Sequence, residues 1–363
     1  MWSHFYVVFL MLVSVVTTTQ FSWAGGNYVS FIKEDLSQSL QLTFPPASDW
    51  QYEKLSKAVL YAEQVGSSAL VVLHDGKLVV EWGKTAFPMK SHSVRKSLLS
   101  ALFGCAIASK KISMSSTLEE LGIDDRPPCL TDEEKKATVS DLLKARSGVY
   151  HGAAAETTVM KKLRPSRGAF AAGQHWYYNN WDFNALGTIF ERKVNKSIGE
   201  AFTEWIAEPV GMQDFTEDDV SYYWEKESLH PAYFFWITAR DLARFGQLFL
   251  QKGRWGNEQI LPEKWVEEST MAHSQMGEKG YGYMWWTYSE GTYAAAGYMG
   301  QRVLVIPKYQ LVIVNRVFSG TPSFNRMPVK IIEELRGYID HVSEKEFQNI
   351  VELILQALPD GNE

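Results

Sequence analysis

The chain has 363 residues, of which 45% are hydrophobic and 13% aromatic, enough for a packed core in one large domain or two ordinary ones. Its formal net charge of −6 argues against a nucleic-acid partner, because such proteins usually present a basic face. The sequence shows no internal repeat and no low-complexity stretch.

The amino terminus has the pattern of a secretory signal peptide. Residues 5–16 are almost wholly apolar but too few to span a bilayer comfortably, and Ser22-Trp23-Ala24 after them forms a small-x-small cleavage site. We therefore expect residues 1–24 to be removed, a periplasmic or secreted mature protein, and no stable membrane anchor. The usual positive charge before the apolar run is missing, which leaves an uncleaved anchor as the alternative.

The first folded elements are predicted to be a helix and a hairpin. Residues 25–48 show no strong period and form an extended lead-in, whereas residues 50–65 have the apolar spacing of an amphipathic helix. Two apolar runs, 69–73 and 77–82, flank Asp75-Gly76, which is a strong signal for a β-hairpin.

The next element is a helix with a hydroxyl and an amine at its first turn. Ser93-Val94-Arg95-Lys96 is followed by a run without charge up to Lys110, as expected of a buried helix. Residues three apart share a helix face, so Lys96 reaches Ser93, and an apolar setting lowers the pKa of the amine. Such a lysine activates a serine for nucleophilic attack. The pattern alone is weak, because Ser30-Phe31-Ile32-Lys33 also matches it.

The two cysteines, Cys105 and Cys129, allow two interpretations. Export permits a disulfide between them. Because Cys105 lies in the apolar helix, a buried free thiol is the simpler interpretation.

The middle of the chain, residues 113–204, is predicted to be a helical lobe. Thr138-Val139-Ser140-Asp141 has the capping pattern of a helix that ends at Ser147-Gly148. Further helices are expected at 181–194 and 198–207, and another beyond the lobe at 238–251.

After Gly280 the pattern changes to short β-rich runs joined by turns, which suits an antiparallel meander. These runs are residues 281–288, 292–296, 302–306 and 311–317. A helix over 322–336 closes the sheet region, and Ser343-Glu344-Lys345-Glu346 begins a last amphipathic helix that packs on the body or binds a partner.

These elements predict an α/β (α+β) fold in which the front hairpin and the meander share one antiparallel sheet flanked by helices, with an inserted all-helical lobe. The sheet domain comprises residues 25–112 and 205–340, the helical lobe 113–204, and a carboxy-terminal helical extension 341–363. Clefts between such lobes are common binding sites.

A second motif precedes the helix predicted at 181–194. Residues 170–187 place a Tyr-x-Asn triplet between Gly173 and a Leu-Gly pair, and two registers fit: Tyr177 with Asn179, or Tyr178 with Asn180. The spacing to both glycines favours the second. This stretch resembles the serine β-lactamase and penicillin-binding-protein hydrolases.

Other segments carry the same resemblance from about residue 68 to 340. They are the Ser-x-x-Lys motif, the helix that ends in Ser147-Gly148, Pro209-Val210-Gly211-Met212, and Thr238-Ala239-Arg240-Asp241-Leu242. The resemblance implies the β-lactamase/penicillin-binding-protein-like fold, in the branch of class C β-lactamases, esterases and 6-aminohexanoate-oligomer hydrolases.

The resemblance also implies roles for single residues. Ser93 is the nucleophile, and Lys96 and Tyr178 form a coupled pair that takes its proton, Tyr178 existing partly as phenolate beside the ammonium. Asn180 contacts the substrate carbonyl or orients Lys96.

The third family motif, Lys-Thr-Gly or His-x-Gly, corresponds to Ala295-Ala296-Gly297. Its small residues let substrate approach the backbone, and the amides of Ser93 and Tyr298 form the oxyanion hole. Here the motif lacks the cation that holds the carboxylate of β-lactams in many relatives. Arg302 replaces it only if its side chain faces the cleft.

We therefore expect a serine hydrolase that cleaves a carboxylic ester or linear amide, acting on a small-molecule ester, amide or peptide-like substrate. The alternatives are a β-lactamase or D-amino-acid carboxypeptidase, and a binding protein without turnover. No metal or cofactor motif is present, His92 and His175 are interpreted as structural, and the oligomeric state stays open. Aromatic residues between 222 and 286 are expected in the core, some of them walling an acyl pocket.

Overall fold

A computed structural model describes residues 50–320 and 341–359. The predicted signal peptide, the Ser30 motif and the helix expected at 322–336 lie outside these ranges. Within them, no helix is both long and apolar enough to cross a bilayer.

The largest sheet of the described residues is antiparallel, with strand order β2-β1-β13-β12-β11-β10-β9-β8. It joins the front hairpin to the meander because β1 pairs with β13, so that Val71 lies opposite Val314. The predicted single sheet is therefore confirmed. The strands are β1 (Ala69–His74), β2 (Lys77–Gly83), β8 (Ser274–Met276), β9 (Lys279–Tyr281), β10 (Trp286–Thr287), β11 (Tyr293–Gly297), β12 (Gln301–Ile306) and β13 (Leu311–Arg316).

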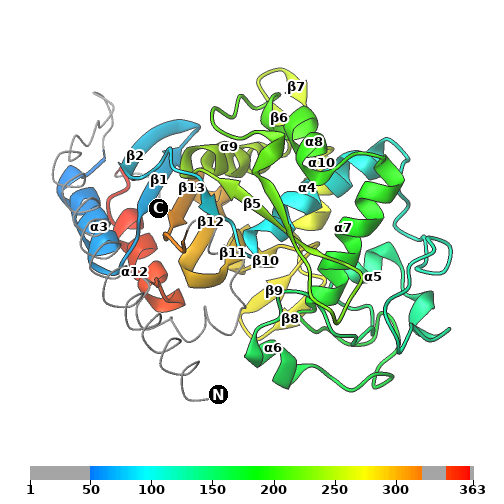
Figure 1. Cartoon of the computed structure of the whole chain (residues 1–363). Coiled ribbons are helices and arrows are strands. Elements are labelled where there is room, and N and C mark those ends of the chain that lie inside the picture. The colour runs from blue at the N-terminus through cyan, green and yellow to red at the C-terminus, as the bar shows by residue number, and fades with distance from the viewer. Residues whose placement is uncertain (1–49, 321–340, 360–363) are drawn as a thin grey trace, which may run out of the picture. The chain divides into compact units, whose positions relative to one another are not determined.

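Helices cover both faces of this sheet (Figure 1). On one side lie α3 (Tyr52–Gln64) and α12 (Glu344–Leu355), which pack against each other. On the other side α9 (Ala239–Leu250) packs on β1, β12 and β13, while α4 (Val94–Ala108) packs on β11 and β12. The helices predicted at 50–65, 238–251 and from Ser343 are confirmed, and the last one packs on the body.

Helix α4 is buried on nearly every face, as its apolar sequence predicts. It lies between the sheet and two other helices, α7 (Asn180–Val194) and α10 (Glu263–Ser269). Gly104 allows the close approach to α10, because a Cβ there would lie 2.5 Å from the Trp265 ring. Cys105 and Cys129 are both free thiols, so the structure contains no disulfide between them.

The region 113–204 contains short helices. They are α5 (Val139–Leu143), α6 (Thr158–Leu163), α7, and α8 (Ile198–Phe202), which continues into a π-helical turn at Thr203–Ala207. The capping box of Thr138 and Asp141 forms as predicted. The helix is shorter than predicted, since it ends at Leu143 and Ala145 has a positive φ of 56°.

Two features of the sheets differ from the prediction. The run 281–288 is not one strand, because a loop at Met284 separates β9 from β10. Met284 has a φ of 63°, and its amide donates to Leu143 O. Its carbonyl accepts a hydrogen bond from Ser97 Oγ. A second antiparallel sheet, β3-β5-β4, was not predicted. Its strands are β3 (Met89–Lys90), β4 (Val220–Tyr223) and the fully buried β5 (Ala232–Ile237); a short hairpin, β6 (Arg254–Trp255) and β7 (Glu258–Gln259), stands apart.

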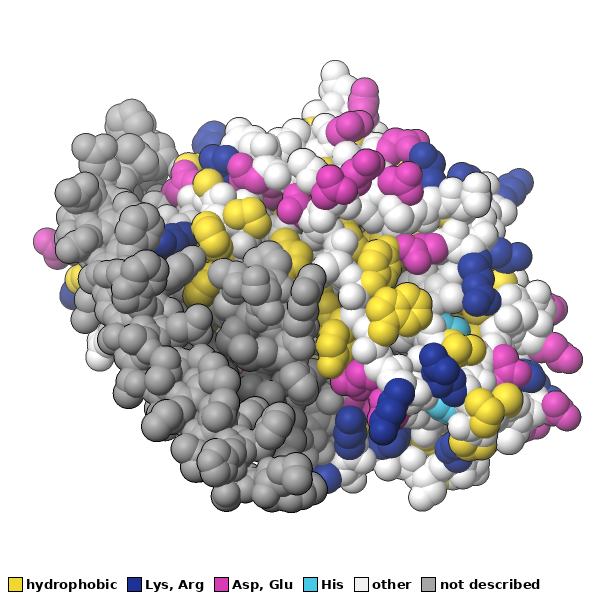
Figure 2. Space-filling model, in the orientation of Figure 1, with side chains coloured by type: hydrophobic (Ala, Val, Ile, Leu, Met, Phe, Trp, Pro, Cys, Tyr) yellow, Lys and Arg dark blue, Asp and Glu magenta, His cyan; other side chains and the backbone are white. Residues whose placement is uncertain are grey.

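Charged side chains of both signs lie on the face drawn in Figure 2. Asp and Glu gather toward its upper edge, and Lys and Arg are more frequent lower down. The described part of this face therefore presents no continuous basic surface, in keeping with the net negative charge.

Candidate active site

Ser93 is the residue that precedes the first turn of α4. The loop before it makes a sharp turn, since His92 has a φ of 47°. Lys96 Nζ donates a hydrogen bond to Ser93 Oγ over 2.8 Å. The structure therefore confirms the contact between the Ser93 hydroxyl and the Lys96 amine that the i, i+3 spacing predicts.

Lys96 is only 2% exposed, and its surroundings disfavour its charge. Burial lowers the pKa of Lys96 well below its ordinary value, and the neighbouring Arg95 guanidinium lowers it further. The Nζ atom lies over the rings of Tyr178 and Phe183, 4.6 and 4.9 Å from their centroids. No carboxylate of the described residues forms an ion pair with Lys96. The prediction that an apolar setting lowers the pKa of Lys96 agrees with this direction.

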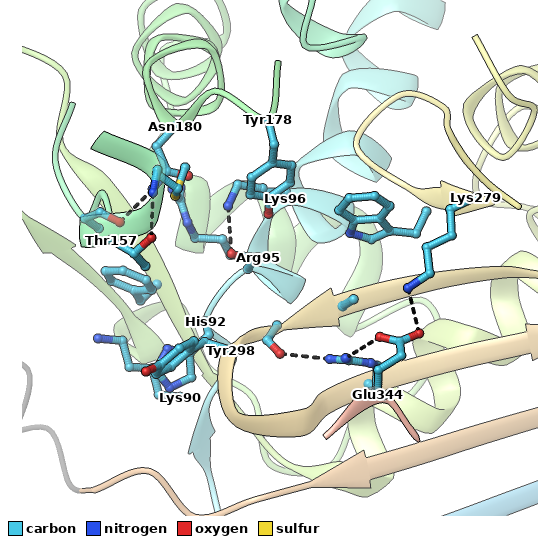
Figure 3. Close-up of a pocket in the computed structure, with 18 of the residues that line it drawn as sticks. Lys90, His92, Arg95, Lys96, Thr157, Tyr178, Asn180, Lys279, Tyr298 and Glu344 are labelled. Carbon is cyan, nitrogen blue, oxygen red and sulfur yellow. Dashed lines mark hydrogen bonds and ion pairs between the residues drawn. The ribbon is translucent and has the colours of Figure 1, made fainter. Parts of the chain in front are cut away.

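Of the two possible tyrosines, Tyr178 is the one that forms a hydrogen bond with Ser93. Its ring lies beside Lys96 (Figure 3). Tyr177 donates instead to Met160 O over 2.7 Å. Burial raises the pKa of Tyr178 to about 12, partly offset by hydrogen bonding to Ser93. The expectation of a partial phenolate is therefore wrong: Tyr178 is a neutral phenol at neutral pH, because desolvation outweighs the nearby positive charges.

Asn180 begins helix α7 and lines the same cavity. Its Nδ2 donates to Ala155 O over 2.7 Å, which ties the amide to the loop before α6 (Figure 3). Asn180 Oδ1 is buried and has no hydrogen-bond partner within the described chain. The amide therefore supports the cavity wall; the structure shows no hydrogen bond from it to Lys96.

The end of β11 passes directly beside the start of α4. A Cβ on Gly297 would lie 2.7 Å from Ser91 O and 3.2 Å from Ser93 N, so only glycine permits this approach. Tyr298 follows and lines the cavity. The prediction that Ala295 contacts the substrate is wrong, because Ala295 is fully buried in the core. Ala296, the next residue, lines the cavity instead.

A cavity of about 390 Å³ opens around these residues. Figure 3 shows Asn180, Thr157 and Lys90 to one side of Lys96, and Lys279 and Glu344 to the other. We call these two sides the Lys90 arm and the Lys279 arm. Phe234 and Trp286, from the group of aromatic residues expected near a pocket, line the cavity.

The Lys279 arm contains a charged triad. Glu344, at the start of α12, accepts from Lys279 Nζ at 3.0 Å and from Arg302 Nη2 at 3.1 Å. Arg302 Nη1 also donates to Gly297 O over 2.9 Å. Arg302 thus lies at the cavity, but its guanidinium is already neutralised and holds the β11 end in place.

The two histidines singled out in the sequence have structural contacts. His92 lines the cavity wall and is half-buried, its Nε2 lies 2.8 Å from Ser319 Oγ, and desolvation lowers its pKa. His175 stacks on Phe170 with centroids 4.1 Å apart and is not among the lining residues. Among the described residues, no cluster of His, Cys, Asp or Glu has the arrangement of a metal site.

Sequence reasoning missed several lining residues, above all Lys90, Thr157, Lys279 and Glu344. Lys90 could have been predicted as a lining residue, because it lies only three residues before Ser93 in the sequence. Glu344 carried none, since the capping motif explained it fully as a helix start.

The chain is similar to known proteins in sequence and in fold. The sequence model of the Beta-lactamase family matches residues 53–324. A D-aminopeptidase from Brucella anthropi is 28% identical over 169 residues, which cover 40% of this chain and 31% of that protein. The chain thus spans about a third of the length of this curated relative.

Solved structures share the fold. A provisionally named 6-aminohexanoate-dimer hydrolase from Bacillus anthracis has a TM-score of 0.58 at 22% identity, covering 84% of this chain and 83% of that one. A class C β-lactamase has a TM-score of 0.58 at 14% identity, covering 86% and 97%. A penicillin-binding protein homologue from Pyrococcus abyssi has a TM-score of 0.56 at 17% identity, covering 86% and 79%.

The family match extends over more than half of the chain and includes all three motifs around the cavity. The protein therefore belongs to the Beta-lactamase family.

Proposed function

We propose that the protein hydrolyses a carboxylic ester or a linear amide through an acyl-enzyme on Ser93. The observation that carries this proposal is the 2.8 Å hydrogen bond between Lys96 Nζ and Ser93 Oγ at the floor of an open cavity. A buried lysine with a lowered pKa is a suitable base for a serine hydroxyl.

In the acylation step, neutral Lys96 takes the Ser93 proton as Oγ bonds to the substrate carbonyl carbon. The amides of Ser93 and Tyr298 stabilise the oxyanion. Tyr178 gives its proton to the departing alcohol or amine and regains one from the Lys96 ammonium, so the C–O or C–N bond breaks without net proton change. Water then attacks the acyl carbon, the same pair takes its proton, and Ser93 leaves with a hydrogen.

The third motif supports an ester or linear amide over a β-lactam. No cation stands in Ala295-Ala296-Gly297, and Arg302 is occupied by Glu344 and Gly297 O. A β-lactamase or D-amino-acid carboxypeptidase is the second candidate, favoured by the family match and the D-aminopeptidase relative. Labelling by a fluorescent penicillin would move the assignment to this candidate.

The test is hydrolysis of 4-nitrophenyl butyrate by the purified protein and by Ser93→Ala. We expect the substitution to abolish turnover, while Ser30→Ala, in the other Ser-x-x-Lys sequence, keeps it. Intact-mass spectrometry after a fluorophosphonate probe should show one adduct, lost in Ser93→Ala. Undiminished turnover by Ser93→Ala would refute the nucleophile, and absence of any adduct would favour a ligand-binding protein without turnover.

The proposal includes export to the periplasm or the medium, supported by the apolar run at 5–16 and the cleavage pattern at 22–24. Mass spectrometry of the secreted protein should find a mature amino terminus at Gly25. An intact amino terminus at Met1 would contradict it.

A further inference from the structure

Glu344 joins two cations in the wall of the cavity. Its Oε1 lies 3.0 Å from Lys279 Nζ, and its Oε2 lies 3.1 Å from Arg302 Nη2 (Figure 3). All three residues line the cavity, and the side chains of Lys279 and Glu344 are each 38% exposed. The two cations thus converge on one carboxylate, in the way that a lysine and an arginine bind the carboxylate of a ligand.

The start of α12 does not require the Glu344 carboxylate. Ser343 and Glu346 form the capping box there: Glu346 N donates to Ser343 Oγ over 3.3 Å, and Ser343 N donates to Glu346 Oε2 over 2.7 Å. The Glu344 side chain instead contacts β9, through Lys279, and β12, through Arg302. Its charge is therefore directed to the cavity wall and not to the end of its own helix.

Glu344 is the one carboxylate among the described lining residues of the cavity. Burial raises the pKa of Glu344, but the hydrogen bond from Lys279 and the charge of Arg302 outweigh this effect and lower the pKa below its ordinary value. At neutral pH the cavity wall therefore carries a fixed negative charge between Lys279 and Arg302.

This charge lies close to the reacting atoms. Arg302 Nη1 donates to Gly297 O over 2.9 Å, and a Cβ on Gly297 would lie 3.2 Å from Ser93 N. The strand end that contacts Arg302 is therefore adjacent to the nucleophile. A substrate bound at Ser93 shares the cavity with Glu344, whichever of its parts lies on that side.

A carboxylate on the substrate would be stabilised best by bridging Lys279 and Arg302. Glu344 already binds both cations, and its own charge repels a second carboxylate. Specificity can arise from such a repulsive element as well as from attractive contacts. In the wild type, a carboxylate on the substrate therefore gains little from this arm.

We propose that Glu344 is a specificity-determining residue that occupies the carboxylate site formed by Lys279 and Arg302. The preferred substrates are then esters or amides without a carboxylate in the part that enters the Lys279 arm, and replacing Glu344 converts the arm into a site for anionic substrates. This inference rests on the proposed acyl transfer to Ser93.

The kinetic test uses two pairs of esters, each a carboxylate and its methyl ester. In mono-4-nitrophenyl adipate the charge is on the acyl part, and in 4-carboxyphenyl butyrate it is on the leaving group. In the wild type, kcat/KM for the charged compound should not exceed that for the neutral one in either pair. Glu344→Gln should raise the charged-to-neutral ratio at least about tenfold in one pair, as a charge-assisted contact allows. The pair that responds identifies the part of the substrate in the Lys279 arm.

Two variants separate the proposed site from a general change in charge. Glu352→Gln, on the exposed side of α12, removes the same charge and should leave both ratios unchanged. Lys279→Met in the Glu344→Gln background should remove the gain, because one of the two cations is lost. A ratio that rises in neither pair, or a gain that persists without Lys279, overturns the proposal.

A binding test separates this inference from the proposed reaction. Calorimetry on Ser93→Ala should show monomethyl adipate binding no more tightly than dimethyl adipate. In Ser93→Ala with Glu344→Gln it should bind at least about tenfold more tightly, with an unchanged circular dichroism spectrum. Absence of this gain overturns the role of Glu344 even if the wild type hydrolyses esters. The gain in binding without any ester hydrolysis by the wild type would overturn the proposed reaction alone.

Discussion

Lys96 is a lysine whose burial and cationic neighbour work against its charge. It is buried, it adjoins the Arg95 guanidinium, and aromatic rings rather than carboxylates surround its amine. Tyr178 is the opposite case, because burial raises its pKa to about 12 and keeps its proton in place. Both shifts favour a neutral amine and a neutral phenol, the state that a base and an acid require before acylation.

The directions of these two pKa shifts predict how the reaction rate depends on pH. Lys96 must be unprotonated to act, so kcat/KM should fall with a slope of one as falling pH protonates it, and stay level toward higher pH. Tyr178→Phe should lower kcat by about 10²- to 10⁴-fold, as expected for loss of a proton-transfer group. It should leave the acidic limb in the same position, because Tyr178 does not titrate there.

The measurement is a pH–rate profile of both proteins between pH 4 and 9 with an activated ester. Lys96→Met should have no acidic limb and very little activity, which serves as the control. An acidic limb that disappears in Tyr178→Phe would assign the titrating group to the phenol and contradict this account.

At the scale of elements, α4 positions the site through its contact with α10. The close approach of the two helices depends on Gly104, whose missing Cβ leaves room for the Trp265 ring. Because interiors are close-packed, a side chain added at this position forces the ring or the helix to move. The helix start, and with it Ser93, is thereby coupled to packing about three turns farther along.

Gly104→Ala is therefore expected to lower the free energy of unfolding by about 1–3 kcal/mol, although alanine is the better helix former. The measurement is urea denaturation followed by tryptophan fluorescence and circular dichroism. In a Trp265→Leu background the same substitution should cost much less, because the ring is gone. An equal cost in both backgrounds would show that the overlap with Trp265 is not the cause.

At the scale of the whole molecule, the two ends of the described chain meet. Gln51 N donates to Ala357 O over 3.0 Å, and Asn349 Nδ2 donates to Tyr61 Oη over 2.9 Å. Helix α12 also supplies Glu344 to the cavity, although it lies beyond the span matched by the family. The last helix thus links the packing of α3 to the charge balance of the site.

Ile350 is the fully buried centre of this helix. Ile350→Ala should lower the free energy of unfolding by about 2–5 kcal/mol, through lost apolar burial and the cavity it leaves. Glu352→Ala, on the exposed side of the same helix, should change it by less than about 0.5 kcal/mol. Equal effects of the two substitutions in urea denaturation would mean that α12 contributes little to the fold.

Much of the architecture was predictable because local patterns report local geometry. Each of these patterns determines the backbone only over a few neighbouring residues. They are the apolar run after Ser93, the Asp75-Gly76 turn, and the capping boxes at Thr138 and Ser343. The strand β5 was missed because it is buried on both faces, so its sequence shows no alternation between apolar and polar residues. The break at Met284 was missed because a positive φ in a non-glycine residue leaves no sequence signal.

By itself, the sequence predicted the Ser93–Lys96 pair, since residues three apart share a helix face and an apolar run follows them. It also determined the small residues at 295–297 and the identity of the fold. Only the tertiary structure decided that Tyr178 stays protonated, that Ala296 faces the cavity, and that Arg95 and Glu344 share it. The burial of a side chain and the charges near it come from elements that are distant in the sequence. These two quantities determine its pKa and its contacts.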